Sequence, residues 1–361
     1  MPDFSDLTAI GATDAVIAAF QPYETRGLLL GRVSVVYSDR YRIYTARGEL
    51  HAEAIGALLY RSERSAWPAV GDWVVAQPVG PGEAPQEAMI HAVLPRRTTF
   101  SRRAAGDGER EQVIAANIDL ALIVCGLDQD FNLRRIERYL TLAHASDADA
   151  AIVLNKSDVC ADLGARLADV ARVAGCAPVV AITARSPEGI EPVLRFLQPG
   201  LTVALLGSSG VGKSTLANRL LGVERQPVQE VRESDSRGRH TTTYRELLPL
   251  PKGGALIDTP GMRELQLWAD RDSLDAAFAE IAVLAAQCRF RDCSHIVDEG
   301  CAVRAALEAG ELDASRWESY RKLRAEIAFH TRQTDVQAAQ AQKKKWKAIH
   351  KAMRVDHKRG N

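Results

Sequence analysis

One nine-residue segment, from Gly207 to Thr215, limits most strongly what this chain can fold into. It reads Gly-Ser-Ser-Gly-Val-Gly-Lys-Ser-Thr, with an apolar run at 201–206 before it and a helix-forming segment at Thr215–Leu221 after it. A glycine-rich turn between a buried strand and a helix is typical of a phosphate-binding loop, because its backbone N–H groups can point inward at phosphate oxygens. The segment therefore predicts an α/β domain with a mostly parallel sheet.

Two further motifs flank this loop in an unusual order. Asn-Lys-Ser-Asp at 155–158 lies upstream, and Asp-Thr-Pro-Gly at 258–261 lies downstream. The carboxylate of Asp158 can accept both N–H donors on the edge of guanine, a pair that adenine cannot supply. GTP-binding domains ordinarily carry the phosphate loop first and the base-reading motif last. The order found here predicts an intact guanine-nucleotide site in a circularly permuted domain.

The phosphate side of the site has four residues with expected roles. Lys213 reaches the terminal phosphates, and the Ser214 hydroxyl ligates magnesium. Asp258 follows an apolar run, so its carboxylate can hold magnesium through water. Gly261 is expected to sense the γ-phosphate. Together these residues predict binding of GTP with Mg²⁺.

The base-reading side of the site draws on a second loop. Lys156 is expected along the plane of the base, and Asn155 is expected to tie the base-reading loop to the phosphate loop. Thr183 and Ala184 follow the next apolar strand, and their backbone can contact the guanine oxygen. The residues predicted to bind the nucleotide are Asn155, Lys156, Asp158, Thr183, Ala184, Gly207, Ser208, Ser209, Gly210, Val211, Gly212, Lys213, Ser214, Thr215, Asp258 and Gly261.

A polar stretch between the phosphate loop and the downstream motif contains Gly-Arg-His-Thr-Thr-Thr at 238–243. One of its threonines is expected to complete the magnesium shell in the GTP state, and we favour Thr242. Met262 follows the downstream motif where many GTPases place a water-positioning glutamine, so unassisted hydrolysis should be slow. We therefore hypothesise that His240 orients the attacking water once a partner fixes this stretch; a solvent-facing histidine is the alternative.

The nucleotide motifs lie in a region, 110–268, in which apolar runs alternate with helical segments. Such alternation predicts a parallel sheet covered on both faces. Residues 244–250 and 255–257 are expected to form a hairpin-like pair that leads into Asp258. The apolar runs lie at 120–124, 151–154, 179–182 and 203–206.

The preceding region, 26–103, has short β-like runs separated by turn residues, which predicts a small β-barrel of the OB-fold type. Residues 104–109 are interpreted as a linker, and 1–25 as an N-terminal extension. Such barrels read oligonucleotides or serve as docking modules, and arginines at 96, 97, 102 and 103 favour RNA. The runs lie at 27–37, 41–45, 49–55, 72–77 and 88–94.

Beyond the nucleotide motifs, residues 269–340 are interpreted as a helical unit around a Cys/His cluster. Three thiols and one imidazole form a closed tetrahedral set of the structural zinc type, with no position open for catalysis. Buried inert thiols are the alternative. The predicted zinc ligands are Cys288, Cys293, His295 and Cys301.

The remaining segment, 341–361, is a basic tail. The whole chain has 46 basic and 46 acidic side chains. From position 343 to the end, however, it has eight Lys or Arg residues and a single acidic residue, Asp356. The tail therefore favours binding to RNA, although a membrane or an acidic partner suits its composition nearly as well. The chain begins without a basic and apolar leader and has no run of about 20 apolar residues, so a cytoplasmic protein without a membrane segment is expected.

The barrel, the permuted motifs and the Cys/His cluster occur in the order of one known family. With the motifs above and Phe-Arg-Asp-Cys-Ser-His at 290–295, the chain resembles the ribosome small-subunit-dependent GTPase A family (RsgA, or YjeQ). The resemblance implies a GTPase that is stimulated by the small ribosomal subunit, binds its rRNA late in assembly and promotes release of assembly factors. It also implies zinc on the Cys/His cluster and a role for His240 in hydrolysis.

Two other classes of function remain open on the sequence. The chain could be a GTP-gated RNA-binding scaffold whose hydrolysis is incidental, or a GTPase that delivers metal held on the Cys/His cluster. A monomer is expected, because a protein whose partner is a ribosomal subunit has no evident need to self-associate.

Overall fold

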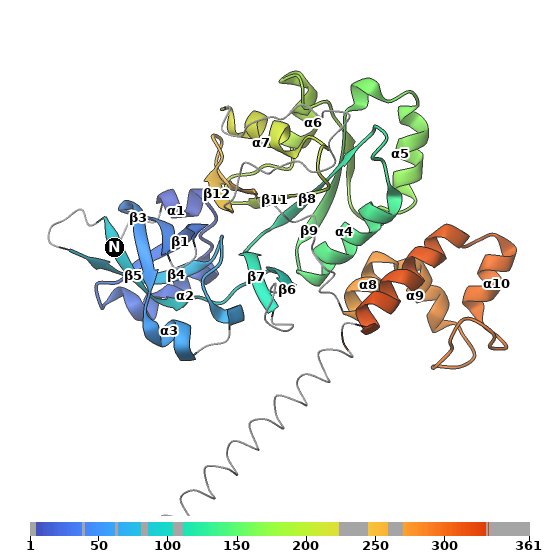
Figure 1. Cartoon of the computed structure of the whole chain (residues 1–361), viewed down its shortest axis with the longest axis horizontal. Helices are drawn as coiled ribbons and strands as arrows, with labels where there is room; N and C mark the ends of the chain where they lie inside the picture. Colours follow the sequence, from blue (N-terminus) through green and yellow to red (C-terminus); the bar gives the residue numbers. More distant parts are fainter. Residues whose placement is uncertain are drawn as a thin grey trace, which may run out of the picture.

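The computed structural model describes residues 5–37, 40–61, 64–80, 86–103, 111–223, 245–258, 270–329 and 331. Within them the chain forms an N-terminal barrel, a central α/β unit and a C-terminal helical unit (Figure 1). His240, Thr242, Gly261 and the basic tail lie outside the described residues. No helix in the described ranges is both long and apolar enough to cross a membrane.

Five strands close the N-terminal barrel, as predicted. They are paired in the order β1-β2-β3-β5-β4, and β4 returns to pair with β1. All these pairings are antiparallel except β3 with β5, which is the strand order of an OB-like barrel. The strands are β1 (Leu29–Val36), β2 (Arg40–Thr45), β3 (Gly48–Ala54), β4 (Trp73–Val79) and β5 (Glu87–Val93).

Two N-terminal helices pack on the outside of this barrel, in the region that the sequence analysis treated as an extension. Helix α1 (Ser5–Ala9) and helix α2 (Asp14–Glu24) bury Leu7 and Phe20 against barrel residues that include Trp73. Thr13 caps α2 by accepting from the backbone N–H of Val16. Helix α3 (Gly56–Arg61) and the short turn η1 (Arg64–Ala66) connect β3 to β4.

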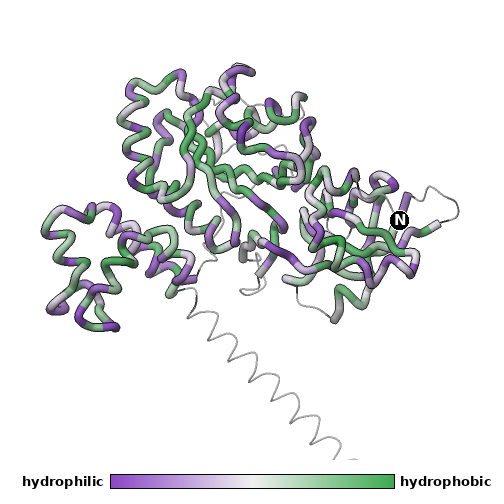
Figure 2. Tube along the Cα trace, turned by 180° about the vertical axis from the view of Figure 1, so that it is seen from behind, coloured by the Kyte–Doolittle hydropathy of each residue, from purple (hydrophilic) through white to green (hydrophobic). Residues whose placement is uncertain are grey.

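The central unit is a six-stranded sheet in the order β10-β9-β8-β11-β13-β12. Its pairings are parallel except that of β12 with β13, so the expected parallel sheet and terminal hairpin are both present. These strands form the most continuous hydrophobic track in Figure 2, as expected for a sheet covered on both faces. They are β8 (Leu120–Gly126), β9 (Asp149–Asn155), β10 (Val179–Ala181), β11 (Thr202–Leu206), β12 (Glu246–Pro249) and β13 (Ala255–Asp258).

Helices cover both faces of the central sheet. One apolar cluster contains residues of α4 and α5, and a second contains residues of α6 and α7. The helices are α4 (Leu133–Ala145), α5 (Leu163–Ala171), α6 (Glu191–Leu194) and α7 (Lys213–Leu221), with short turns η2 (Ser157–Val159) and η3 (Glu188–Ile190).

A two-stranded ribbon joins the barrel to the central unit. Strand β6 (Thr99–Arg103) pairs antiparallel with β7 (Glu111–Ala116), and the predicted linker at 104–109 lies outside the described residues. Phe100 and Ala115 are fully buried in the core shared with the central sheet. The ribbon is thus packed against the central unit.

Two further links join the barrel to the central unit. Strand β1 pairs with β12 at Val35 and Glu246, so that the strands of the described residues, apart from the ribbon, belong to one 11-stranded sheet. Arg32, almost fully buried, donates to the backbone oxygens of Ile10 and Asn117 and, at 2.8 Å, to Oγ1 of Thr202. One guanidinium therefore connects the N-terminal segment, the barrel and the central sheet.

The helical unit consists of α8 (Arg271–Ala277), α9 (Ala279–Ala286), α10 (Ala302–Ala309) and a helical stretch at 314–329. It packs on α4 of the central unit, which it adjoins in Figure 1. The contact contains an ion pair of 2.8 Å between Glu137 and Arg316, both almost fully buried. Arg138 and Glu326 form a second, bidentate ion pair, in which Nη1 and Nη2 of Arg138 donate to the two carboxylate oxygens at 2.8 and 2.7 Å.

Candidate nucleotide site and metal cluster

The predicted phosphate loop runs between the end of β11 and the start of α7, as the motif requires. Gly207 and Gly212 have φ angles of 147° and 93°, which favour glycine. A Cβ on Gly207 would lie 2.3 Å from the carbonyl oxygen of Val124, and one on Gly212 would lie 2.2 Å from Nδ2 of Asn155. Backbone conformation and close neighbours both require the two glycines of the motif.

Lys213 lies folded over this loop. Its ammonium donates to the carbonyl oxygens of Gly207 and Ser208 at 2.8 and 2.5 Å. These two bonds fix the ammonium at the loop, close to the backbone N–H groups that would receive phosphate. The arrangement suits a lysine that contacts terminal phosphates.

Asn155 joins three segments of the site. Its Nδ2 donates to the carbonyl oxygen of Val211 in the phosphate loop at 2.8 Å. Its Oδ1 accepts from the backbone N–H of Ala184 at 3.0 Å. This buried amide makes the link between the loops that the sequence predicted, and it extends that link to the third loop.

The carboxylate of Asp158 is held by a partner that the sequence analysis did not assign. Thr183 donates its hydroxyl to Oδ1 of Asp158 at 2.7 Å, whereas only backbone contacts were expected from Thr183. Arg185 lies 3.9 Å from the second carboxylate oxygen. The hydroxyl fixes one oxygen of the carboxylate that would read guanine.

A loop after β8 brings two more carboxylates to the site. Asp128 accepts from the ammonium of Lys156 at 2.5 Å, and Asp130 accepts from the hydroxyl of Ser208 at 2.5 Å. Sequence reasoning missed both. The available signal was their position directly after a buried strand, because ligands of open α/β sheets lie at the carboxyl ends of such strands.

Asp258 ends β13, which pairs in parallel with β11. The carboxyl ends of both strands therefore lie at one edge of the sheet, so Asp258 is on the same side as the phosphate loop and Ser214. Ser214 and Asp258, proposed to act on magnesium, lie in described ranges, whereas Thr242 and the γ-phosphate-sensing Gly261 do not.

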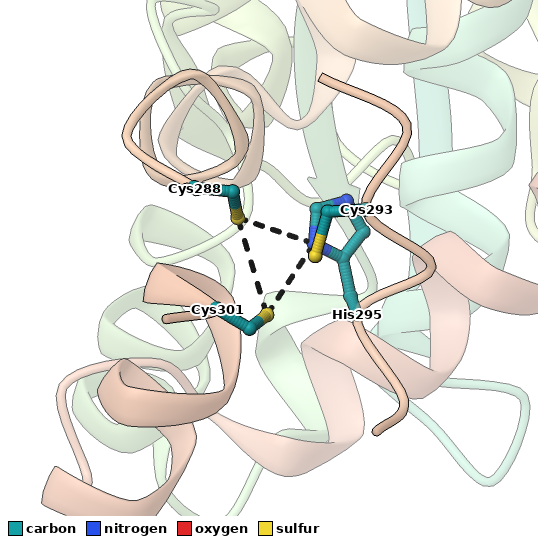
Figure 3. A group of neighbouring side chains, drawn as sticks. All are labelled: Cys288, Cys293, His295 and Cys301. Carbon is teal, nitrogen blue, oxygen red and sulfur yellow. Dashed lines mark hydrogen bonds between the residues drawn. The ribbon is translucent and has the colours of Figure 1, made fainter. Parts of the chain in front are cut away.

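The Cys/His cluster converges on one point between α9 and α10 (Figure 3). Its four potential ligand atoms all lie within 4.8 Å of one another. The Sγ atoms of Cys288 and Cys301 are 3.9 Å apart, and each lies 3.5 Å from Nδ1 of His295. Tetrahedral zinc with ordinary bond lengths requires separations of about 3.8 Å between sulfurs and about 3.6 Å between sulfur and nitrogen. The separations among Cys288, His295 and Cys301 therefore fit a zinc ion, and Sγ of Cys293 lies within 4.8 Å of the other three ligand atoms.

One of the barrel arginines has an internal role. Arg96 donates to both carboxylate oxygens of buried Asp72 at 2.8 and 2.7 Å, and to the carbonyl oxygen of Trp67 at 2.6 Å. Arg97 pairs with Asp119 at the start of the central sheet. The interpretation of Arg96 as an RNA contact is not supported, since its guanidinium is occupied within the protein.

Fold and site together define a class of protein. The strand that carries the phosphate loop lies between β8 and β13, while the base-reading strand β9 comes earlier in the chain. This is a circularly permuted GTPase domain with an OB-like barrel before it and a helical unit after it.

Comparison with known proteins agrees with the assignment of a GTPase domain. Residues 93–268 match the family model described as RsgA GTPase. A protein of Opitutus terrae named small ribosomal subunit biogenesis GTPase RsgA is 49% identical over 97% of both chains. A protein of the same name from Syntrophotalea carbinolica is 45% identical, covering 91% of this chain and 92% of its own.

Two solved structures are similar as well. YjeQ from Thermotoga maritima superposes with a TM-score of 0.63 at 26% identity, covering 83% of this chain and 99% of its own. YloQ, described as a circularly permuted GTPase, superposes with a TM-score of 0.59 at 23% identity, covering 83% and 95%. The chain belongs to the RsgA GTPase family, and it is a GTPase.

Proposed function

We propose that this GTPase acts in the assembly of the small ribosomal subunit, where it binds the subunit and its rRNA, hydrolyses GTP and promotes release of assembly factors. The observation that carries the proposal is the 49% identity, over 97% of both chains, to a relative named for small ribosomal subunit biogenesis. We further propose that the protein acts in the cytoplasm as a monomer.

The proposed nucleotide site uses the three loops that Asn155 joins. Asp158 accepts the two guanine donors, and the phosphate loop with Lys213 receives the phosphates. Magnesium, when bound with GTP, neutralises charge on the phosphates; Ser214 and Thr242 would ligate it directly, and Asp258 through water. Gly207 and Gly212, where close protein neighbours leave no room for a Cβ, support the assignment of this segment as the phosphate loop.

For hydrolysis, we propose that His240 orients the attacking water after the subunit fixes its stretch of chain. Position 262 is methionine, where many GTPases carry the glutamine that positions the attacking water. Unassisted hydrolysis should therefore be slow, which supports a role for another residue. A His240→Ala variant should bind GTP normally and lose its subunit-stimulated turnover. Turnover at the unaltered stimulated rate would remove His240 from this role.

The ribosomal proposal is tested by measuring GTP turnover with purified small and large subunits. We expect a large increase with small subunits and little with large ones, and co-sedimentation with small subunits in the GTP-analogue state. Lys213→Ala provides the control, since it should abolish turnover under every condition. Equal and negligible turnover of the unaltered protein with both subunits would instead favour a GTP-gated scaffold.

For the metal, we propose one structural zinc ion on the Cys/His cluster. Zinc there would crosslink α9 to α10. Protein purified without chelator should contain about one zinc ion per chain, measured by elemental analysis, and Cys293→Ser should reduce that content. Metal-free protein with unaltered folding of the helical unit would contradict the assignment. A cargo site should exchange its metal readily during turnover, whereas a structural site should retain it.

A further inference from the structure

The phosphate loop contacts an ion pair that no nucleotide motif includes. Asp130 lies in the loop after β8, and Arg135 lies in the first turns of α4. Nη1 of Arg135 donates to Oδ2 of Asp130 at 2.5 Å and to Oγ of Ser208 at 2.7 Å. Ser208 in turn donates its hydroxyl to Oδ2 of Asp130 at 2.5 Å. The three side chains form a closed hydrogen-bonded triangle.

Ser208 connects this triangle to the lysine of the phosphate loop. Its side chain is bonded to Asp130 and Arg135, and its backbone carbonyl accepts from the ammonium of Lys213 at 2.5 Å. Rotation of the Ser208 peptide would therefore disturb both sets of bonds at once. The orientation of the carbonyl that holds Lys213 depends on the side-chain triangle.

The ionic state of the pair is well defined. Burial alone would raise the pKa of Asp130, but hydrogen bonds from Arg135 and Ser208 hold it below its ordinary value. The hydrogen bond to Asp130 raises the pKa of Arg135. Both groups are thus charged at neutral pH, and the hydrogen bonds of the triangle are of the stronger, charge-assisted kind.

The position of Arg135 favours a role at the site over a role in holding the units together. The neighbouring arginines of α4, Arg134 and Arg138, pair with Glu318 and Glu326 of the helical unit. Within the described residues, the side-chain hydrogen bonds of Arg135 go to Asp130 and to Ser208 of the phosphate loop, both in the central unit. About a third of each side chain of the Asp130–Arg135 pair is exposed, so its contribution to overall stability should be small.

We propose that Asp130 and Arg135 are positioning residues for the phosphate loop, which hold Ser208 so that its carbonyl sets Lys213 against the terminal phosphates. The proposal rests on the assignment of Gly207–Thr215 as the phosphate loop. It adds two residues to the proposed site that act through Ser208 and Lys213 rather than by touching the nucleotide.

The test is a double-mutant cycle on the affinity for GDP and for a non-hydrolysable GTP analogue. Ser208→Ala and Arg135→Ala should each weaken both affinities roughly tenfold, as expected for loss of a hydrogen bond to a charged group. The double variant should be no weaker than either single variant, because both changes break the same triangle. Arg135→Lys should restore most of the affinity, since a single nitrogen of Arg135 makes both bonds.

Arg134→Ala is the matched control, because it removes the adjacent arginine and an exposed ion pair of 3.6 Å on the side of the helical unit. It should leave both affinities unchanged. Additive losses in the double variant, or an Arg135→Ala affinity equal to that of the control, would overturn the proposal. If Arg135→Ala melts earlier than the control, Ser208→Ala and Arg135→Lys still decide the outcome. Unaltered affinity in Lys213→Ala would overturn the phosphate-loop assignment itself, and this inference with it.

Discussion

Gly212 is required by a neighbouring side chain as well as by its backbone conformation. A methyl group there would collide with the amide of Asn155, the residue that joins the base-reading and phosphate loops. The close approach of these two residues is possible only because one has no side chain. The base half and the phosphate half of the site are therefore matched to each other by direct packing.

The carboxylate of Asp158 gives the sharpest prediction for a single residue. Asp158→Asn replaces one acceptor oxygen by an N–H donor, so affinity for GTP and GDP should fall at least about 100-fold through the loss of charge-assisted hydrogen bonds. Xanthine carries a carbonyl where guanine carries an amino group, so the variant should gain affinity for xanthosine triphosphate. Titration with both nucleotides measures this switch.

The control for that prediction is Asp162→Asn, which changes a carboxylate that caps α5 nearby in the chain. It should leave nucleotide preference unchanged. Retention of tight GTP binding by Asp158→Asn would show that another group reads the base.

For individual residues, the sequence was informative about the three nucleotide-binding motifs, because the spacing within each motif follows from the shape of a phosphate or a base. It did not identify Asp128, Asp130 or the role of the Thr183 hydroxyl. Asp130 and Ser208 are 78 positions apart, and only the parallel pairing of β8 with β11 brings them together. Side-chain partners of this kind depend on the tertiary fold rather than on local sequence.

Among the elements, helix α8 begins where the central unit gives way to the helical unit. Asp270 caps it by accepting from the backbone N–H and the hydroxyl of Ser273 at 2.8 and 2.5 Å. Asp270→Ala should lower the free energy of unfolding by about 1 kcal/mol at neutral pH. Denaturant unfolding monitored by circular dichroism measures the change.

The same cap should respond to acid. The hydrogen bonds from Ser273 hold the pKa of Asp270 below its ordinary value. The cap therefore stabilises the folded protein above the unfolded pKa of about 3.9, and this contribution is lost as pH falls through the lower folded value. The difference between Asp270→Ala and the unaltered protein should shrink over that range. A difference that stays constant down to pH 2 would contradict the cap.

The strands were predictable from alternating or continuous apolar runs, and the barrel strands begin and end within about two residues of the predicted limits. Helix α1 and the β6–β7 ribbon were not predicted. A five-residue helix such as α1 is not stable alone, and Leu7 gains its burial only from the outer wall of the barrel. Short elements of this kind are stabilised by what they pack against, which their own sequence does not reveal.

For the whole molecule, the sequence predicted three units but not how they are joined. The buried pair of Glu137 and Arg316 fixes the helical unit on α4, and Ser319 also donates to Glu137. Arg316 keeps a second carboxylate partner in Glu280 at 2.6 Å. This contact is the buried polar link between α4 and the helical unit.

Glu137→Gln should lower the free energy of unfolding by about 3 kcal/mol, because a buried guanidinium loses one of its two carboxylates. Hydrogen exchange of the backbone at 314–329 should speed up as the helical unit loosens. Glu318→Gln is the control, since it removes a carboxylate from the same interface whose pairs are exposed, and it should cost less than about 1 kcal/mol. Equal effects of the two changes would show that the buried pair does not hold the interface.

The pairing of β1 with β12 has a consequence for the central unit when it is produced without the barrel. Strand β12 is the edge strand of the six-stranded central sheet. If it were uncovered, its unpaired backbone N–H and C=O groups could pair with a strand of another chain. The barrel covers that edge at Val35 and Glu246. A fragment that begins after the barrel would therefore expose this strand edge as a template for self-association.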